Sequence, residues 1–141
     1  MESLWTRTSD TAARPPLYGD TEAEVAVIGG GMAGILTALL LHERGLRTVV
    51  LEAERVGAGQ TRDTTAKLTS QHGAIYAELL ERFGREKAQM YADANQRAIQ
   101  SYRRLIEKYG IDCDFEQTDA ILYSHAHEDA MRREAEAAVS L

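Results

Sequence analysis

The chain has 141 residues, of which 44% are hydrophobic and 27% are charged, a composition that predicts one globular domain with a modest core. Its formal net charge of -6 and the lack of a Lys/Arg cluster argue against binding to a nucleic-acid backbone. The single cysteine excludes an internal disulfide and a cluster of cysteine ligands for a metal within this sequence.

Residues 1–21 are predicted to form an extended lead-in segment, because Pro15, Pro16 and Gly19 lie among scattered Ser and Thr residues. The opening residues have neither the basic nor the apolar stretch of a secretory signal. No later run is long enough to span a bilayer. The sequence therefore predicts a cytoplasmic protein without a membrane-spanning segment.

The most informative stretch runs from Val25 to Glu52. It consists of a short apolar strand, the turn GGGMAG at residues 29–34, an apolar helix and a second strand that ends in an acid. This order is typical of a dinucleotide-binding βαβ unit. The sequence therefore predicts an α/β fold of the Rossmann type.

The small residues of the turn each have an expected mechanical role. Gly29 permits the tight turn out of the strand, Gly31 lets the backbone approach a pyrophosphate, and Gly34 lets the helix lie against the sheet. The helix that starts near Met32 points its unpaired N–H groups and the positive end of its dipole at the phosphates. No basic side chain is needed there. Gly45 is expected to end this helix.

Glu52 is expected at the carboxyl end of the second strand, about 20 residues after the glycines. An acid at this place accepts hydrogen bonds from the two ribose hydroxyls of an adenosine and repels a 2′-phosphate. The sequence therefore favours FAD or NAD over NADP. A glycine-rich turn alone is weak evidence, but here the strand before it, the helix after it and the terminal acid all agree.

Residues 53–70 lose apolar periodicity and are rich in Gly and Thr, which predicts a long functional loop. Two helices are predicted next: the first ends at Gly84, and the second is long and amphipathic and ends at Gly110. The apolar stripe of the second helix favours a core face over a partner-binding surface. Asn95 within that stripe is expected to be a buried amide that bonds a neighbouring backbone group, not a catalytic residue.

The last part of the chain is predicted to contain an antiparallel pair of short strands, 112–116 and 120–123, followed by a helix from Glu128. Cys113, in the first of these strands, is expected to be a buried and inert thiol. The helical pattern stops at Leu141 without a cap, so we expect that the chain is cut within a longer domain.

Three parts of the sequence resemble FAD-dependent oxidoreductases of the D-amino-acid oxidase and glycine oxidase (DAO) type. They are 24–34 with Leu51 and Glu52, 57–61 with 64–73, and 91–96 with 111–115. The last two are similar to a subgroup in which a Rieske-type [2Fe-2S] domain follows at the far C-terminus. The resemblance implies that residues 22–141 are the N-terminal part of an FAD-binding domain, truncated at its C-terminus.

The resemblance also implies which residues surround FAD. The pyrophosphate-binding positions of the family correspond to Gly29, Gly31, Met32, Ala33 and Gly34. The ribose-binding positions correspond to Glu52 and Ala53. The positions that run along the pyrophosphate toward the isoalloxazine ring correspond to Thr61, Thr64, Thr65, Ala66 and Lys67.

Catalytic residues are less well defined. Lys67 could stabilise negative charge on the reduced flavin, or it could be a solvated surface group. His72 could contact substrate at the flavin face, or it could cap or pack against the next helix. His125 and His127 are expected to be solvated, and Rieske ligation needs cysteines that this sequence lacks. A Rieske cluster is therefore expected only in a C-terminal region outside this sequence.

Three hypotheses for function follow. The first is the FAD-binding portion of an oxidoreductase that oxidises a small-molecule amine or amino acid by hydride transfer from a C–H bond to FAD. The second is a non-catalytic truncated fragment that binds a dinucleotide weakly or not at all. The third is an NAD-binding module, for which residues 57–73 are a poorer match. Alone, the 141-residue chain is expected to have very little or no activity.

Overall fold

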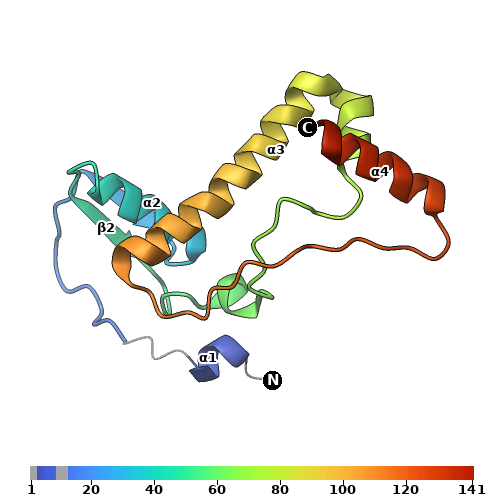
Figure 1. Cartoon of the computed structure of the whole chain (residues 1–141). Coiled ribbons are helices and arrows are strands. Elements are labelled where there is room, and N and C mark those ends of the chain that lie inside the picture. Colours follow the sequence, from blue (N-terminus) through green and yellow to red (C-terminus); the bar gives the residue numbers. More distant parts are fainter. Residues whose placement is uncertain (1–2, 9–12) are drawn as a thin grey trace. The chain divides into compact units, whose positions relative to one another are not determined.

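The structure is a computed structural model that describes residues 3–8 and 13–141. Its elements in chain order are α1 (Leu4–Thr8), β1 (Val25–Ile28), α2 (Met32–His42), β2 (Thr48–Leu51), the 3-10 turn η1 (Gly59–Asp63), α3 (Tyr76–Tyr109) and α4 (Glu128–Ser140) (Figure 1). They divide into two compact units, one that ends at Ala66 and one that starts at Lys67. Within the described ranges, no helix combines the length and the apolar character needed to cross a membrane.

The first unit is built around a small parallel sheet. Val25 of β1 lies opposite Thr48 of β2, and Ile28 lies opposite Leu51. Helix α2 connects the two strands and contacts both of them. The predicted order of strand, turn, helix and parallel strand is confirmed at these residues, and the fold of this unit is mixed α/β. Helix α2 ends at His42, and Gly45 adopts a φ of +83° in the turn that follows.

The N-terminal segment differs in part from its prediction. Residues 4–8 form the short helix α1, whereas an extended chain was expected over 1–21. A helix of one turn leaves no periodic pattern in the sequence, and its side chains are held by contacts with η1, far along the chain. Residues 13–21 contain neither helix nor strand, as predicted, and residues 1–2 and 9–12 of this segment lie outside the described residues. The predicted loop 53–70 is irregular apart from η1.

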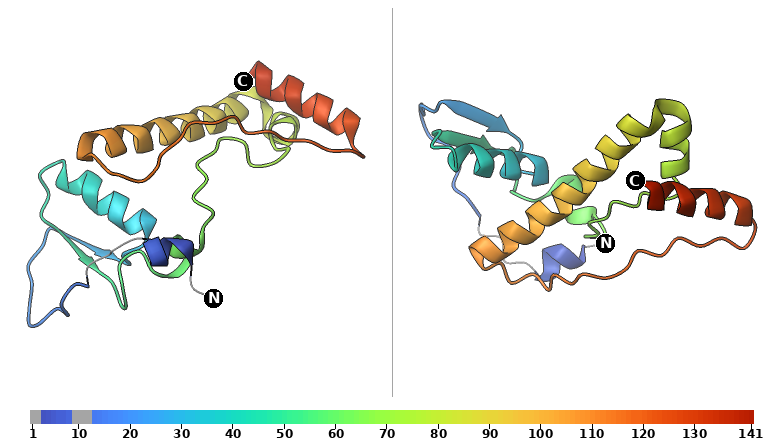
Figure 2. Two further views of the ribbon diagram at one scale, coloured as in Figure 1. Left: turned by 60° about the horizontal axis from the view of Figure 1, so that its bottom comes forward. Right: turned by 45° about the horizontal axis from the view of Figure 1, so that its top comes forward.

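The second unit is a pair of packed helices. The backbone of Gly84, with φ of 76° and ψ of 169°, interrupts α3, so the predicted boundary between two helices is confirmed. Gly110 ends α3 in the left-handed conformation, also as predicted. Helix α4 packs against the N-terminal part of α3 (Figure 2), where Tyr76, Ala92 and Ala137 form the buried cluster.

A buried carboxylate joins these two helices. Glu134 of α4 is only 3% exposed. Its Oε1 accepts hydrogen bonds from the N–H groups of Ile75 at 3.0 Å and Tyr76 at 2.9 Å, and its Oε2 accepts one from Ala77 at 2.8 Å. The first N–H groups of a helix have no partner within that helix. Glu134 therefore caps α3 from a neighbouring element.

The predicted strands at 112–116 and 120–123 are wrong, because residues 111–127 contain neither helix nor strand. Asp114 has a φ of +49°, which breaks an extended chain, and Tyr123 is 77% exposed. A two-stranded hairpin with no further strand or helix on its face is marginally stable at best. The prediction for Cys113 is also wrong, since its side chain is exposed instead of buried.

Candidate functional site

The glycine-rich turn connects β1 to α2, and its backbone lies very close to the first turn of α2. The N–H of Gly29, with φ of +100°, donates to the carbonyl oxygen of Leu51 at 2.8 Å, which joins the turn to the end of β2. A Cβ atom added to Gly34 would lie 2.0 Å from the carbonyl oxygen of Gly29. Only glycine fits there, because real Cβ contacts are essentially never below 3.0 Å. The turn and the first turn of α2 are thus in direct contact.

Glu52, at the end of β2, folds back onto this turn. Its Oε2 accepts the N–H of Gly30 at 2.6 Å, and its Oε1 accepts the N–H of Glu54 at 3.0 Å. Backbone hydrogen bonds from Glu54, Gly30 and Ala53 lower the pKa of Glu52, although partial desolvation acts in the opposite direction. Each carboxylate oxygen has a second lone pair and can accept a further donor. The arrangement holds an ionised acceptor beside the turn, with Ala53 exposed next to it.

Gly30 also belongs to the site, although it was not predicted as a site residue. It is buried, and a Cβ added there would lie 3.1 Å from Cβ of Glu52. Its carbonyl oxygen accepts the N–H of Gly57 at 2.9 Å, so this residue also joins the turn to the following loop. The signal was present, since three consecutive glycines in one turn suggest close backbone contact.

The loop that follows β2 brings a hydroxyl group to the N-terminus of α2. Oγ1 of Thr61 accepts the N–H of Met32 at 3.0 Å and would lie 3.3 Å from a Cβ added to Gly31. Gly31 is the N-cap of α2, has an extended backbone and offers no side chain for capping. This contact places the hydroxyl of Thr61 beside the glycine-rich turn. Ala33, in the first turn of α2, is exposed.

The rest of this loop lies on the surface of the first unit. Thr64, Thr65 and Ala66 are exposed, and Oγ1 of Thr64 donates to the carbonyl oxygen of Thr61 at 3.3 Å. Ala66 has a φ of +54°, an uncommon conformation for a residue with a Cβ atom. These residues offer hydroxyl and backbone groups to solvent, and none of them carries a charge.

Lys67 and His72 belong to the second unit, and both are exposed. Nδ1 of His72 lies 3.0 Å from the hydroxyl oxygen of Tyr91 in α3, and the two rings meet edge to face. This contact favours the packing alternative for His72. Asn95, one turn further along α3, donates from Nδ2 to the carbonyl oxygen of Tyr91 at 2.9 Å, as predicted, although its side chain is only half-buried.

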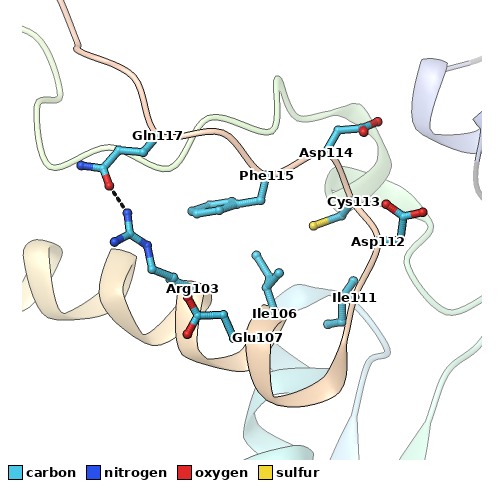
Figure 3. A pocket seen from close by; sticks show the side chains of 9 residues that line it. All are labelled: Arg103, Ile106, Glu107, Ile111, Asp112, Cys113, Asp114, Phe115 and Gln117. Atoms are coloured by element: carbon cyan, nitrogen blue, oxygen red, sulfur yellow. Dashed lines mark hydrogen bonds between the residues drawn. The ribbon is translucent and has the colours of Figure 1, made fainter.

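The second unit also has a hollow of about 450 Å³ between the end of α3 and the chain that follows it (Figure 3). Cys113 and Phe115 point into it, and Arg103 closes one side by a hydrogen bond to Gln117. The described residues contain no cluster of His, Cys, Asp and Glu that could hold a metal ion, in this hollow or elsewhere. His125 and His127 are exposed.

Comparison with known proteins assigns the family. Residues 24–141 match the model of the DAO family, described as FAD dependent oxidoreductase. The chain belongs to this family. The resemblance drawn from the sequence is thus confirmed. No solved structure gives a significant match.

Several curated relatives are similar over most of this chain. YhfW of Bacillus subtilis (strain 168), whose name places it among Rieske 2Fe-2S iron-sulfur proteins, is 42% identical over 94% of this chain and 26% of its own length. OrdL of Haemophilus influenzae, named as an oxidoreductase, is 33% identical over 77% of this chain and 25% of its own length. Gamma-glutamylputrescine oxidoreductase of Escherichia coli (strain K12) is 33% identical over 65% of this chain and 22% of its own length. The chain therefore spans about a quarter of the length of these relatives.

Proposed function

We propose that this chain is the FAD-binding part of a flavin-dependent oxidoreductase and that the glycine-rich turn with α2 is a Rossmann-type site for the FAD pyrophosphate. The contact between Gly34 and Gly29, with no room for a Cβ atom, carries the proposal. It supports an arrangement in which the turn lies directly against the first turn of α2, beside the hydroxyl of Thr61 that accepts the N–H of Met32. Helix N-termini bind phosphate through unpaired N–H groups and the helix dipole. Gly29, Gly31, Met32, Ala33 and Gly34 would hold the pyrophosphate.

The ribose of the adenosine half is assigned to Glu52 and Ala53. The two backbone hydrogen bonds to Glu52 fix its carboxylate and favour the ionised form, which is the better acceptor for ribose hydroxyl groups. A negative charge there disfavours a 2′-phosphate. Thr61, Thr64, Thr65, Ala66 and Lys67 would continue the site along the pyrophosphate, and the hydroxyl of Thr61 already lies at the N-terminus of α2.

For the whole protein we propose oxidation of an amine or amino-acid C–H bond, with a small molecule as substrate. The similarity to gamma-glutamylputrescine oxidoreductase supports this substrate class. When bound, FAD supplies the hydride-accepting chemistry, and the residues of this chain bind and orient it. His72 is assigned a packing role because of its contact with Tyr91. The similarity to YhfW supports a Rieske [2Fe-2S] domain elsewhere in the whole protein, since this chain has a single cysteine.

An absorbance spectrum tests the proposal. The purified chain is mixed with FAD, free cofactor is removed, and the retained flavin band is measured for the wild type and for Glu52→Arg. Glu54→Arg is the matched control, because it reverses a neighbouring exposed charge while the Glu54 N–H can still bond to Glu52. We expect flavin to be retained by the wild type and the control and to be lost from Glu52→Arg.

Two other results would overturn the proposal. A wild-type chain that stays colourless and shows no calorimetric signal with FAD or NAD would support the non-catalytic fragment. A chain that binds NAD but not FAD would support the NAD-binding module. Both results are read from binding alone, so neither depends on catalytic turnover.

A further inference from the structure

Side chains in and directly before helix α1 hold the η1 turn through hydrogen bonds to backbone carbonyl oxygens in and directly after the turn. The indole N–H of Trp5 donates to the carbonyl oxygen of Thr64 at 2.8 Å, and the hydroxyl of Ser3 donates to the carbonyl oxygen of Arg62. The two acceptors lie within and directly after η1, and Figure 2 shows α1 against this turn. Trp5 of α1 and Ser3 directly before it thus fix a segment about sixty residues further along the chain.

The η1 turn also contacts the N-terminus of α2, which belongs to the candidate pyrophosphate site. Oγ1 of Thr61 accepts the N–H of Met32 at the N-terminus of α2, and Oγ1 of Thr64 donates to the carbonyl oxygen of Thr61. A continuous path of hydrogen bonds therefore leads from Trp5 through Thr64 and Thr61 to α2. No part of the path involves a charged side chain.

We infer that α1 is a clamp that preorganises the η1 turn for cofactor binding, and that Trp5 is a positioning residue for the pyrophosphate site. The inference rests on the proposed FAD function. A loop that is already ordered binds more tightly, because its conformational entropy is not lost at the moment of binding. Trp5 itself touches no reacting atom; it acts by holding the loop that carries Thr61.

The first test compares FAD affinity by calorimetry. Trp5→Phe removes the N–H donor and keeps an aromatic ring. Tyr18→Phe is the matched control, since Tyr18 belongs to the same unit and is 84% exposed. We expect about a fivefold weaker affinity for Trp5→Phe, the size of one net hydrogen bond, and no change for Tyr18→Phe. Ser3→Ala, which removes the other donor, should weaken binding in the same direction without any loss of apolar packing.

The second test does not involve FAD. Limited trypsin digestion followed by mass spectrometry measures cleavage after Arg62, in η1, and after Arg47, which precedes β2. Loss of the clamp should accelerate cleavage after Arg62 several-fold and leave cleavage after Arg47 unchanged. A merely structural role for Trp5 would loosen the whole unit and accelerate both.

The possible outcomes separate this inference from the proposed function. If the wild type binds FAD and Trp5→Phe matches it in affinity and in cleavage after Arg62, the clamp is refuted and the FAD site stands. Equal acceleration at Arg62 and Arg47 would also refute the clamp. If the wild type binds no FAD, the proposed function fails and the positioning role fails with it.

Discussion

Glu134 provides a direct test of how the second unit is stabilised. Its carboxylate accepts the N–H groups of Ile75, Tyr76 and Ala77 while being almost fully buried. The negative charge also lies at the positive end of the α3 dipole, where it is favourable. We therefore expect substitutions at Glu134 to lower the free energy of unfolding of the helix pair α3 and α4.

The magnitude follows from the hydrogen bonds that each substitution removes. Glu134→Gln keeps one oxygen acceptor for Ile75 and Tyr76 but loses the charge and the acceptor for Ala77. Hydrogen bonds to charged groups contribute roughly 1.5–3 kcal/mol, so we expect Glu134→Gln to lower the free energy of unfolding by about 2–3 kcal/mol. Glu134→Ala removes all of these acceptors, and the loss rises to about 3–5 kcal/mol, as for the breaking of other buried charged interactions.

The assay is urea denaturation of the whole chain, followed by circular dichroism of the helical signal. Glu136→Gln is the matched control, because Glu136 lies on the same helix and is exposed. We expect the free energy of unfolding to decrease from the control to Glu134→Gln and further to Glu134→Ala. If Glu134→Gln unfolds at the same urea concentration as the control, the ionised cap contributes nothing and the reasoning is refuted.

Three further predictions concern single residues. Gly34→Ala would place a Cβ atom 2.0 Å from the carbonyl oxygen of Gly29. We therefore expect a decrease of about 1–3 kcal/mol in the free energy of unfolding, measured by a thermal melt. An unchanged melting temperature would contradict the close contact. Hydrogen bonds from Glu54 and Gly30 lower the pKa of Glu52, so the stability that they contribute is present above pH 4.5 and is lost as the pH falls through the lowered pKa. A carboxyl-carbon NMR titration should give a midpoint below 4.5, and a midpoint at or above that value would refute this assignment. Cys113 is exposed and should react with a thiol reagent as fully in the folded chain as in urea; protection in the folded chain would show that it is buried.

The parts of the fold that the sequence predicted correctly are those encoded by neighbouring residues. Short apolar runs form β1 and β2, and glycines with positive φ at Gly84 and Gly110 interrupt and end α3. At the candidate site, Glu52 directly follows β2, as predicted, whereas its hydrogen bond to Gly30 and the contact of Thr61 with Met32 were not predicted. In each case the signal is a side-chain type at a fixed spacing, which a single sequence carries.

The parts that were missed depend on partners far along the chain. Helix α1 leaves no periodic pattern, and Trp5 is held by a carbonyl oxygen 59 residues away. Residues 112–123 have the composition of strands, but an extended segment forms a stable sheet only when other strands or helices cover it. Local propensity cannot supply those neighbours.

The cap of α3 shows how such a distant partner can still leave a trace in the sequence. The N-cap of α3 is Ile75, whose side chain has no oxygen that could accept a hydrogen bond from the first N–H groups of the helix. The first N–H groups of a buried helix end must nevertheless be satisfied. An N-cap without a side-chain acceptor therefore indicates that an acceptor arrives from another element, and Glu134 lies 57 to 59 residues from the groups that it bonds. The identity of that element still depends on packing, because Glu134 resembles any other glutamate of a charged helix until α4 is in contact with α3.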